Sequence, residues 1–506
     1  MPTTQKDFAK LFELSKHTRI LQGIVSLLDW DQETYMPAGA AAIRGEQLKV
    51  MAGIIHRERT GTNFTKALGQ LIDLKTGQFL AKDLTASQQA ALREWRRDYL
   101  HETALPSQFV EEFALVTSQS VLAWRLAKKE NSFSQFAPFL DRIVQLSRKK
   151  ADYLGYEDHP YDALIDQFEP HVKTEEISQL FEKIRHTLTP LIKKLSQKNI
   201  PTQFLYGEWD PNKQMKFGDK ILEAMGYDRQ KGRVDFSSHP FSSSSHPSDS
   251  RITTRLHKNS LMSHLMVILH EGGHALYEMG LSEDEYGSPL GEARSLGVHE
   301  SQSRWWETRI GLSLPFWRYF FPLLKEQFKG QLEGITLEEF YLAINEVKPS
   351  FIRVEADEVT YPIHVILRFE LEKELIAGNL KIRDVPEAWN SKMQNYLGIL
   401  PENNQEGCLQ DIHWAMGSFG YFPTYTLGNV YAAHLFEAFA KAHPEWEQKV
   451  AAGELLFVKS WLHENIYRYG REFSTQDLLK NATKKEFSAD PYLHYLKHKY
   501  QTLYQV

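Results

Sequence analysis

The chain has 506 residues, of which 42% are hydrophobic and 25% are charged, which is the composition of a globular protein and excludes a disordered or fibrous one. Its 59 Lys and Arg residues stand against 65 Asp and Glu residues, so the formal net charge of −6 offers no basic excess for a nucleic-acid partner. A single cysteine, no apolar signal segment at the N-terminus and no apolar run long enough to span a membrane predict a cytoplasmic protein without membrane contact.

Helical periodicity dominates the chain. Apolar residues recur at three- and four-residue spacing in stretches at roughly 5–29, 38–58, 86–103, 106–151, 313–347, 359–400 and 428–501. A further helix is predicted over Thr174–Lys198, and Pro190 is expected to bend or break it. The clearest strand pattern is Arg251–Leu256. We therefore predict a mainly α fold with a small β-element near the middle of the chain.

The domain organisation follows from what the chain lacks. Its length alone would allow about three domains or one large helical body. The one low-complexity stretch, Ser237–Ser250, has the serine-rich composition of a flexible surface loop. No other segment has the Pro, Gly or Ser density of an interdomain linker, and no repeat at roughly 30–50 residues is present. We therefore expect residues 1–506 to form a single domain without an independent linker.

The strongest chemical signal is the sequence H-E-G-G-H at residues 270–274, an H-E-x-x-H motif. It lies in a predicted helix that begins near Ser260 and ends at Gly280. Histidines four residues apart share one face of a helix, so both imidazoles can bind one metal ion, and Glu271 can accept a proton from the attacking water. Chance gives roughly 0.1 such patterns in a chain of this composition, so the motif by itself is suggestive rather than decisive.

Two adjacent glycines, Gly272 and Gly273, strengthen the functional interpretation. In the middle of a helix each of them costs about 1 kcal/mol relative to alanine, a cost that a purely structural helix has little reason to carry. We interpret them as allowing a substrate backbone to approach closely. A catalytic metal site is therefore favoured over a core helix with incidental histidines.

A third metal ligand is needed, because catalytic zinc usually has three protein ligands and an open position. Between His274 and Glu300 lie 25 residues (275–299), enough to end one helix, cross a loop and return on a second helix. Glu292 is a rival ligand in the same segment, and Glu278, one turn beyond His274, is a candidate partner for a ligand. We predict that His270, His274 and Glu300 bind the metal.

Several motifs in a characteristic order make the sequence resemble the carboxypeptidase Taq family of metallocarboxypeptidases over nearly its whole length. Besides H-E-x-x-H, the matching segments are Trp30–Pro37, His239–Phe241 (HPF), Asp249–Thr253 (DxRxT), His299–Gln302 (HES-Q), Ile352–Asp357 (IRxxAD) and Gly407–Trp414 (GxxQDxHW). Because HPF and DxRxT flank the serine-rich segment, the resemblance implies that this segment borders the active site.

The resemblance carries expectations about fold and activity. It implies a largely helical protein with two helical halves around a long substrate groove, like neurolysin and angiotensin-converting enzyme. It also implies a homodimer that uses zinc, or cobalt, to remove single residues from peptides with a free C-terminus. In this resemblance His270, His274 and Glu300 bind the metal, and Glu271 is the general base and later the proton donor.

The chain departs from the family pattern at two places. Ser242–Ser248 is richer in serine than is usual for relatives, which often have glycine there. Pro362 falls where the family normally continues a helix, so we expect a kink or a later helix start. Neither departure involves a predicted ligand.

Further residues are assigned to the substrate. The tetrahedral oxyanion needs hydrogen-bond donors, for which His413 and either Tyr421 or Tyr425 are candidates, although buried His and Tyr side chains are often only structural. The free α-carboxylate of the substrate suits an arginine, whose fork can bind both oxygens. Arg353 is the first candidate and Arg251 the second, against the alternative that each forms a structural salt bridge.

Two other functions remain open at this stage. The same metal helix could serve an oligo-endopeptidase or a dipeptidyl-carboxypeptidase, which cut at other positions in a peptide. A non-catalytic helical scaffold with a structural zinc is the other alternative, although an intact Glu271 and an open coordination position argue against it. Zinc and cobalt both suit two histidines and a carboxylate, so the ligand set does not choose between them.

Overall fold

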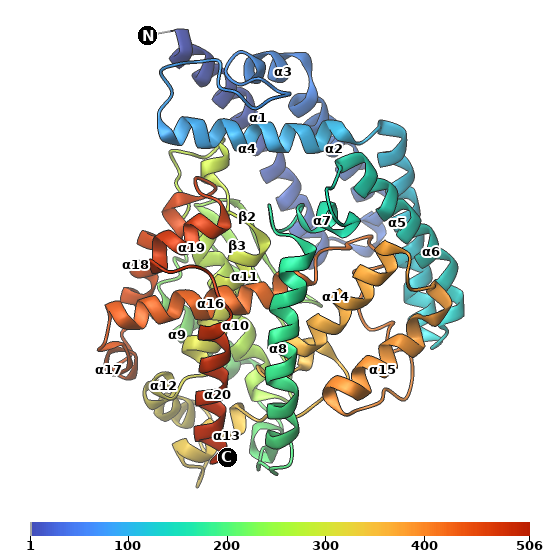
Figure 1. Ribbon diagram of the computed structural model, residues 1–506. Coiled ribbons are helices and arrows are strands. Elements are labelled where there is room, and N and C mark those ends of the chain that lie inside the picture. The colour runs from blue at the N-terminus through green and yellow to red at the C-terminus, as the bar shows by residue number, and fades with distance from the viewer. Residues whose placement is uncertain (1–2) are drawn as a thin grey trace.

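The computed structural model describes residues 3–506 and shows a mainly helical chain with one small sheet, which confirms the predicted fold class (Figure 1). The chain begins with helices α1 (Thr3–Thr34), α2 (Ala41–Thr60), α3 (Thr62–Gly69), α4 (Ala86–Ala104), α5 (Ser107–Lys129), α6 (Phe133–Leu154), α7 (Pro160–Ile165), α8 (Thr174–Leu195) and α9 (Pro211–Met225). Strands β1 (Val234–Phe236), β2 (Ser242–His246) and β3 (Asp249–Thr254) follow. The middle of the chain continues with α10 (Leu261–Met279), α11 (Leu296–Arg304), a π-helix (Trp305–Gly311), α12 (Leu314–Gln327) and α13 (Leu337–Ile344). The last helices are α14 (Tyr361–Ala377), α15 (Val385–Leu397), α16 (Pro423–Ala442), α17 (Trp446–Ala451), α18 (Leu456–Asn465), α19 (Thr475–Thr483) and α20 (Asp490–Tyr504).

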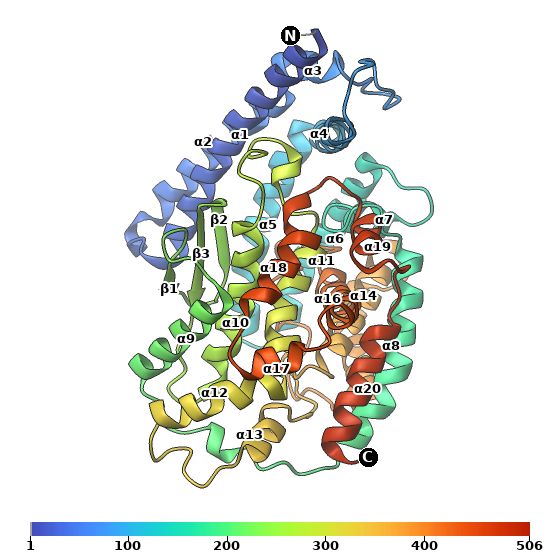
Figure 2. The same ribbon diagram turned by 90° about the vertical axis from the view of Figure 1, so that its left-hand side faces the viewer.

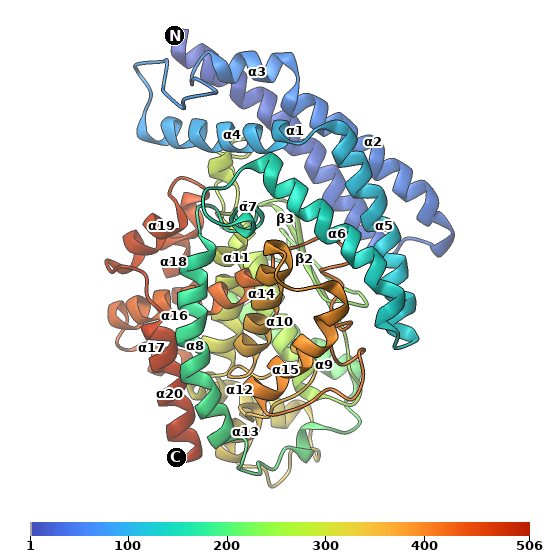
Figure 3. The same ribbon diagram turned by 45° about the vertical axis from the view of Figure 1, so that its right-hand side comes forward.

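The first four helices form a layer at the N-terminal end of the molecule (Figure 3). This layer has a small hydrophobic cluster of its own, with Leu11, Phe64, Leu68 and Trp95 among its buried members. Leu290, which lies between α10 and α11, belongs to the same cluster. The N-terminal layer therefore packs on the segment that joins these two helices.

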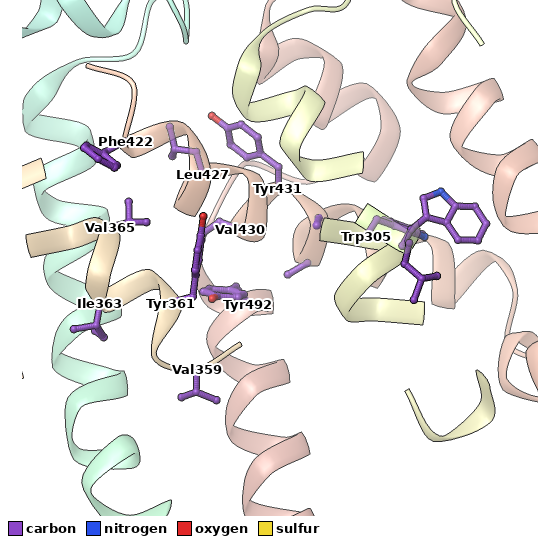
Figure 4. Close-up of a cluster of buried hydrophobic side chains, with 14 of the residues drawn as sticks. Trp305, Val359, Tyr361, Ile363, Val365, Phe422, Leu427, Val430, Tyr431 and Tyr492 are labelled. Atoms are coloured by element: carbon purple, nitrogen blue, oxygen red, sulfur yellow. The ribbon is translucent and has the colours of Figure 1, made fainter. Parts of the chain in front are cut away.

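Helices α10, α11 and α16 lie in the interior of the molecule, surrounded by the other helices (Figure 2). α11 contacts both α10 and α16, and these helices contribute to the large hydrophobic core. Figure 4 shows part of that core, where Trp305, Tyr361, Leu427, Val430 and Tyr492 come from segments far apart in the sequence. Burial of so many large apolar side chains stabilises the placement of α11.

The sheet has the strand order β1-β3-β2, with β3 parallel to β1 and antiparallel to β2. The strand expected at Arg251–Leu256 is confirmed as β3, shifted by two residues. The flexible loop expected from the serine-rich composition is wrong for Ser242–His246, which forms β2. β2 pairs with β3 along one edge, and Ser244 donates a hydrogen bond to Ser250 at 2.6 Å. Composition does not reveal these contacts.

Two expectations about proline have different outcomes. Of the bend or break expected at Pro190, the break does not occur, because α8 continues through this residue. Pro190 is exposed, whereas Phe181, Leu188 and Leu191 anchor the other face of α8 in the core, so the missing hydrogen bond faces solvent. The later helix start at Pro362 is confirmed, because α14 begins at Tyr361 and places Pro362 in its first turn. Over residues 3–506, no helix is long and apolar enough to cross a membrane.

Candidate metal and active site

The two histidines of the H-E-x-x-H motif lie on α10, and Glu300 lies on α11. Oε2 of Glu300 is 3.6 Å from Nε2 of His270 and 3.4 Å from Nε2 of His274. One ligand atom from each of the three residues lies within 4.8 Å of the other two. Two imidazole nitrogens and a carboxylate oxygen in this arrangement are a donor set that suits a catalytic divalent metal.

The two glycines of the motif allow close packing between helices. A Cβ atom on Gly273 would lie 2.6 Å from the carbonyl oxygen of Gln302 and 2.8 Å from Cα of Ser303, both on α11. A Cβ atom on Gly272 would meet side chains of α9, Leu222 and Met225, at 3.0 Å. The interpretation that these glycines make room for a substrate backbone is therefore wrong. Gly273 brings α10 close enough to α11 for the three candidate ligands to meet, and Gly272 brings α10 close to α9.

A third glycine acts on the other side of α11. A Cβ atom on Gly428 of α16 would lie 2.5 Å from Cγ of Glu300. Glu300 is thus enclosed between α10 and α16, and the residue is only 7% exposed. This enclosure limits the positions that its carboxylate can take.

Each candidate histidine ligand has a partner for its second ring nitrogen. Nδ1 of His270 lies 2.7 Å from Oε2 of Glu307 in the π-helix, and Nδ1 of His274 lies 2.5 Å from Nδ1 of His299. Nε2 of His299 in turn lies 2.8 Å from Oε1 of Glu278. These partners direct the two Nε2 atoms toward Glu300. Glu278, the sequence-based candidate for this role, makes its hydrogen bond to His299 and none to His274 within residues 3–506.

Glu292, the rival to Glu300, lies in a different ionic cluster. Its carboxylate accepts a hydrogen bond from Arg471 at 3.1 Å and lies 3.7 Å from Arg19. The structure therefore brings Glu300 to the two histidines and leaves Glu292 outside that group.

The electrostatics of the cluster couple the acid and the histidines. Burial raises the pKa of Glu271 to about 7, opposed by His270 and reinforced by Glu300. Burial lowers the pKa of His270, but the charges of Glu300 and Glu307 raise it to about 9. The two motif histidines hold the pKa of Glu300 below its usual value despite burial. A carboxyl group that titrates near neutrality suits proton transfer at physiological pH.

Arg353 lies in a second polar cluster. Its Nε and Nη2 donate to Oδ1 of Asp411 at 3.1 and 2.9 Å, and its Nη1 donates to the hydroxyl of Tyr361 at 3.2 Å. Arg368 binds the other oxygen of Asp411, with its Nη2 at 2.6 Å. Two guanidinium groups therefore share one carboxylate, which leaves a net positive charge in a buried place.

The same cluster contains the candidate oxyanion donors. The guanidinium of Arg353 lies 4.8 Å from the ring centroid of Tyr425, and Nε2 of His413 lies 3.2 Å from the hydroxyl of Tyr425. The ring of Tyr421 is 5.3 Å from the rings of both His413 and Tyr425. The structure thus brings four of the predicted substrate residues together, and Tyr361 joins them.

Comparison with known proteins identifies the family of this chain. Residues 10–500 match the model of the family described as carboxypeptidase Taq (M32) metallopeptidase. The chain belongs to this family. It is 38% identical to thermostable carboxypeptidase 1 of Thermus thermophilus, over 99% of this chain and 100% of that one. It is 36% identical to carboxypeptidase 1 of Bacillus subtilis, over 99% of both chains.

Solved structures of carboxypeptidases have the same fold. The crystal structure of the M32 carboxypeptidase from Deinococcus radiodurans superimposes with a TM-score of 0.96 at 38% identity, over 99% of this chain and 100% of that one. Metallocarboxypeptidase 1 of Trypanosoma cruzi does so with a TM-score of 0.93 at 31% identity, over 98% and 99% of the two chains. The protein is therefore an M32 metallocarboxypeptidase.

Arg251 of this M32 peptidase lies elsewhere than Arg353. Its Nε donates to Asp249 at 2.7 Å, and its guanidinium lies 4.8 Å from the ring of Trp30 on α1. Within residues 3–506 its ion pair is with Asp249 alone. The structure thus places Arg251 where α1 meets β3, and does not join it to the Arg353 cluster.

Sequence reasoning missed several residues of this peptidase that support the candidate site. They are Glu307, which contacts His270, and the pair Asp411 and Arg368, which surround Arg353. Asp411 lies within the GxxQDxHW segment. Its place in a motif indicates that the residue matters but does not indicate what it contacts. Glu307 and Arg368 belong to no motif, and only the packing of distant helices reveals their partners.

Proposed function

We propose that this metallocarboxypeptidase binds zinc through His270, His274 and Glu300 and releases single amino acids from the free C-terminus of peptides. The observation that supports this proposal is the convergence of these three side chains next to the buried carboxyl group of Glu271. A bound zinc ion would act as a Lewis acid, which lowers the pKa of water and polarises the scissile carbonyl group.

Glu271 is the general base in this proposal. Its side chain lies on the same helix as both histidines, and its pKa of about 7 lets it accept a proton from water and release it again near neutral pH. It then gives that proton to the leaving amine, so one carboxyl group serves both halves of the reaction.

The Arg353 cluster recognises the substrate in this proposal. The positive charge that Arg353 and Arg368 retain around Asp411 attracts the terminal carboxylate, and the arginine fork binds both of its oxygens. His413 and Tyr421, with Tyr425 beside them, donate hydrogen bonds to the developing oxyanion. Burial is the main reason that the pKa of His413 is lowered to about 4, so its ring is neutral and carries one N–H donor at neutral pH.

Arg251 is the second candidate for the carboxylate. Its ion pair with Asp249 and its stacking on Trp30 occupy its guanidinium, so we assign it to the junction of α1 and the sheet rather than to the substrate. Exchange of each arginine separately tests this choice.

Two experiments test the reaction. Digestion of an unblocked peptide followed by mass spectrometry should give a ladder of products, each one residue shorter at the C-terminus. Internal cuts or dipeptide steps would favour an oligo-endopeptidase or a dipeptidyl-carboxypeptidase. Glu271→Gln should abolish turnover while the metal content stays that of the wild type. Undiminished turnover would exclude Glu271 as the base.

The requirement for a metal is tested by removing the ion and adding it back. Chelation should abolish activity, and titration with Zn²⁺ should restore it at one ion per chain. Co²⁺ should also restore activity, because both ions suit this ligand set. Metal analysis of the protein as isolated from its own cells identifies the ion it carries. Activity that survives complete chelation would contradict the proposal.

We also propose a cytoplasmic homodimer whose residues 1–506 act as one domain. The lone Cys408 supports a reducing compartment. The packing of Leu290 into the N-terminal cluster supports one domain. Light scattering after size-exclusion chromatography should give twice the mass of one chain, and thermal unfolding should show one transition. The mass of a monomer would refute the homodimer, and two separate unfolding transitions would refute the single domain.

A further inference from the structure

Glu169, in the loop between α7 and α8, is a fully buried carboxylate outside the candidate active site. Its Oε2 accepts a hydrogen bond from the backbone N–H of Gly297 at 3.0 Å, and its Oε1 accepts one from the hydroxyl of Thr475 at 2.8 Å. The hydroxyls of Ser295 and Tyr431 also lie beside it. Glu169 thus joins the loop before α8 to α11, α16 and α19.

The surroundings of Glu169 are costly for a carboxylate. Within residues 3–506 its hydrogen-bond donors are neutral, and the nearest positive influence, Arg294, acts at longer range. Burial raises the pKa of Glu169 to about 7. Hydrogen bonds from Gly297, Thr475 and Ser295, together with the N-terminal end of α11, compensate part of this cost. A buried group at this cost calls for a role beyond the filling of space.

The contact falls one helical turn before Glu300. Gly297 precedes Glu300 by three residues on α11, and the preceding N–H group, that of Leu296, donates to the carbonyl oxygen of Phe168 at 3.1 Å. Residues 168–169 therefore bind two successive N–H groups at the start of the helix that carries Glu300. A Cβ atom on Gly297 would lie 2.3 Å from Oε2 of Glu169, so only glycine allows this contact.

The remaining contacts of α11 restrain it in a different way. Gly273 of α10 and Gly428 of α16 bring their helices close to α11 through van der Waals contact. Such contacts fix the distance between helices but have little directional preference along the helix axis. The hydrogen bonds at the start of α11 are directional, and they therefore fix its position along the axis and its rotation.

We propose that Glu169 is a positioning residue of the metal site, which holds α11 where the carboxylate of Glu300 meets His270 and His274. The proposal rests on the proposed function, in which these three side chains bind the metal. It does not place Glu169 in contact with the metal or the substrate.

The test compares zinc affinity in Glu169 variants with that in a matched control. Glu169→Ala and Glu169→Gln are prepared, and the Kd for Zn²⁺ is measured by competition with a chromophoric chelator. Loss of a residue that orients a ligand weakens metal binding by about 10- to 100-fold, so we expect at least a 10-fold increase in Kd for Glu169→Ala. Glu169→Gln, which keeps one acceptor, should give a smaller increase.

Glu372 provides the control. It is also fully buried, and it accepts hydrogen bonds from the hydroxyl of Tyr161, from Nε1 of Trp414 at 2.8 Å and from the N–H of Gly420 at 3.1 Å. It makes no hydrogen bond to α11 in the part of the chain that the structure describes. Glu372→Ala should therefore lower the melting temperature about as much as Glu169→Ala, with less than a threefold change in the Kd for Zn²⁺.

A second measurement separates geometry from stability. In protein loaded with Co²⁺, the visible absorption bands report the arrangement of the ligands. We expect Glu169→Gln and Gly297→Ala to change these bands and Glu372→Gln to leave them as in the wild type. Gly297→Ala tests the same contact from the other side, should Glu169→Ala not fold.

The outcomes distinguish the two proposals. Wild-type protein that binds zinc, together with Glu169 and Gly297 variants that keep its affinity and its cobalt spectrum, would overturn this inference alone. Equal weakening of zinc binding in the Glu169 and Glu372 variants would also overturn it, because a general loss of stability would then explain both. Wild-type protein that binds no divalent metal would overturn the proposed function and this inference together.

Discussion

Nδ1 of His270 lies 2.7 Å from Oε2 of Glu307, and the same oxygen accepts a hydrogen bond from Arg304 at 2.6 Å. Arg304 is itself held by Asn429 of α16, to which its Nε donates at 2.7 Å. The orientation of one candidate metal ligand therefore depends on a chain of contacts that reaches a third helix. The arginine keeps Glu307 ionised, as an acceptor for the imidazole N–H.

Glu307→Ala should weaken zinc binding by about 10- to 100-fold, because the ring of His270 loses the partner that orients it. The Kd for Zn²⁺ is measured by chelator competition. Glu292→Ala is the control, because Glu292 pairs with Arg471 and should leave the affinity within about threefold of wild type. A weaker affinity in the Glu292 variant than in the Glu307 variant would restore Glu292 as the third ligand.

Gly273→Ala should destabilise the protein, although helix propensity alone predicts stabilisation of about 1 kcal/mol. The added Cβ atom meets backbone atoms of α11 at 2.6 and 2.8 Å, and we expect a loss of about 1–3 kcal/mol together with weaker zinc binding. Urea denaturation of the metal-free protein measures the loss. Gly45→Ala on α2 is the control, because nothing lies within 4 Å of its Cβ position, and it should stabilise by about 0.5–1 kcal/mol. Stabilisation by both exchanges would contradict the close contact.

Arg353→Met should lower kcat/KM for peptides with a free C-terminus by about 10- to 100-fold, since a charged hydrogen-bond partner of the carboxylate is lost. Amidated peptides lack that carboxylate, so their slower cleavage should change far less. Arg251→Met should affect both kinds of peptide alike, because its guanidinium is engaged by Asp249 and Trp30. Steady-state kinetics with matched pairs of free and amidated peptides decide which of the two arginines binds the carboxylate. If Arg353→Met lowered kcat/KM equally for free and amidated peptides, Arg353 would not be the residue that binds the substrate carboxylate.

The buried carboxyl group of Glu372 should make stability depend on pH. Burial raises the pKa of Glu372 in the folded protein from the usual 4.5 to about 7. Between pH 4.5 and pH 7 the folded protein therefore keeps a proton that the unfolded chain has released. Stability therefore falls as pH rises through this window and is constant above it. Glu372→Gln does not titrate, so wild type relative to the variant should lose at most about 3 kcal/mol between pH 5 and pH 8.

Urea denaturation of the metal-free proteins at both pH values measures this difference. Glu46→Gln, an exchange of an exposed glutamate on α2, is the control for the substitution itself. A difference in stability between wild type and Glu372→Gln that stays constant from pH 5 to pH 8 would show that Glu372 is ionised in the folded protein throughout.

Local sequence determined the parts of this protein that depend on neighbours along the chain. The four-residue spacing of His270 and His274 places both on one face of α10, because the helix repeats every 3.6 residues. The apolar periodicity likewise predicted a mainly helical fold, and the order of the motifs indicated the family. These features need no knowledge of which helices touch.

Only the tertiary structure decided the features that depend on contacts between distant segments. Glu300 and Glu292 were both open as ligands until the packing of α11 against α10 placed Glu300 beside the histidines. The prediction that Gly273 makes room for a substrate is wrong for the same reason, because the backbone that lies against Gly273 belongs to another helix, α11. The partners of Glu169 and Glu307 lie on elements whose relative positions are set by burial of large apolar surfaces, which periodicity along a single helix does not specify.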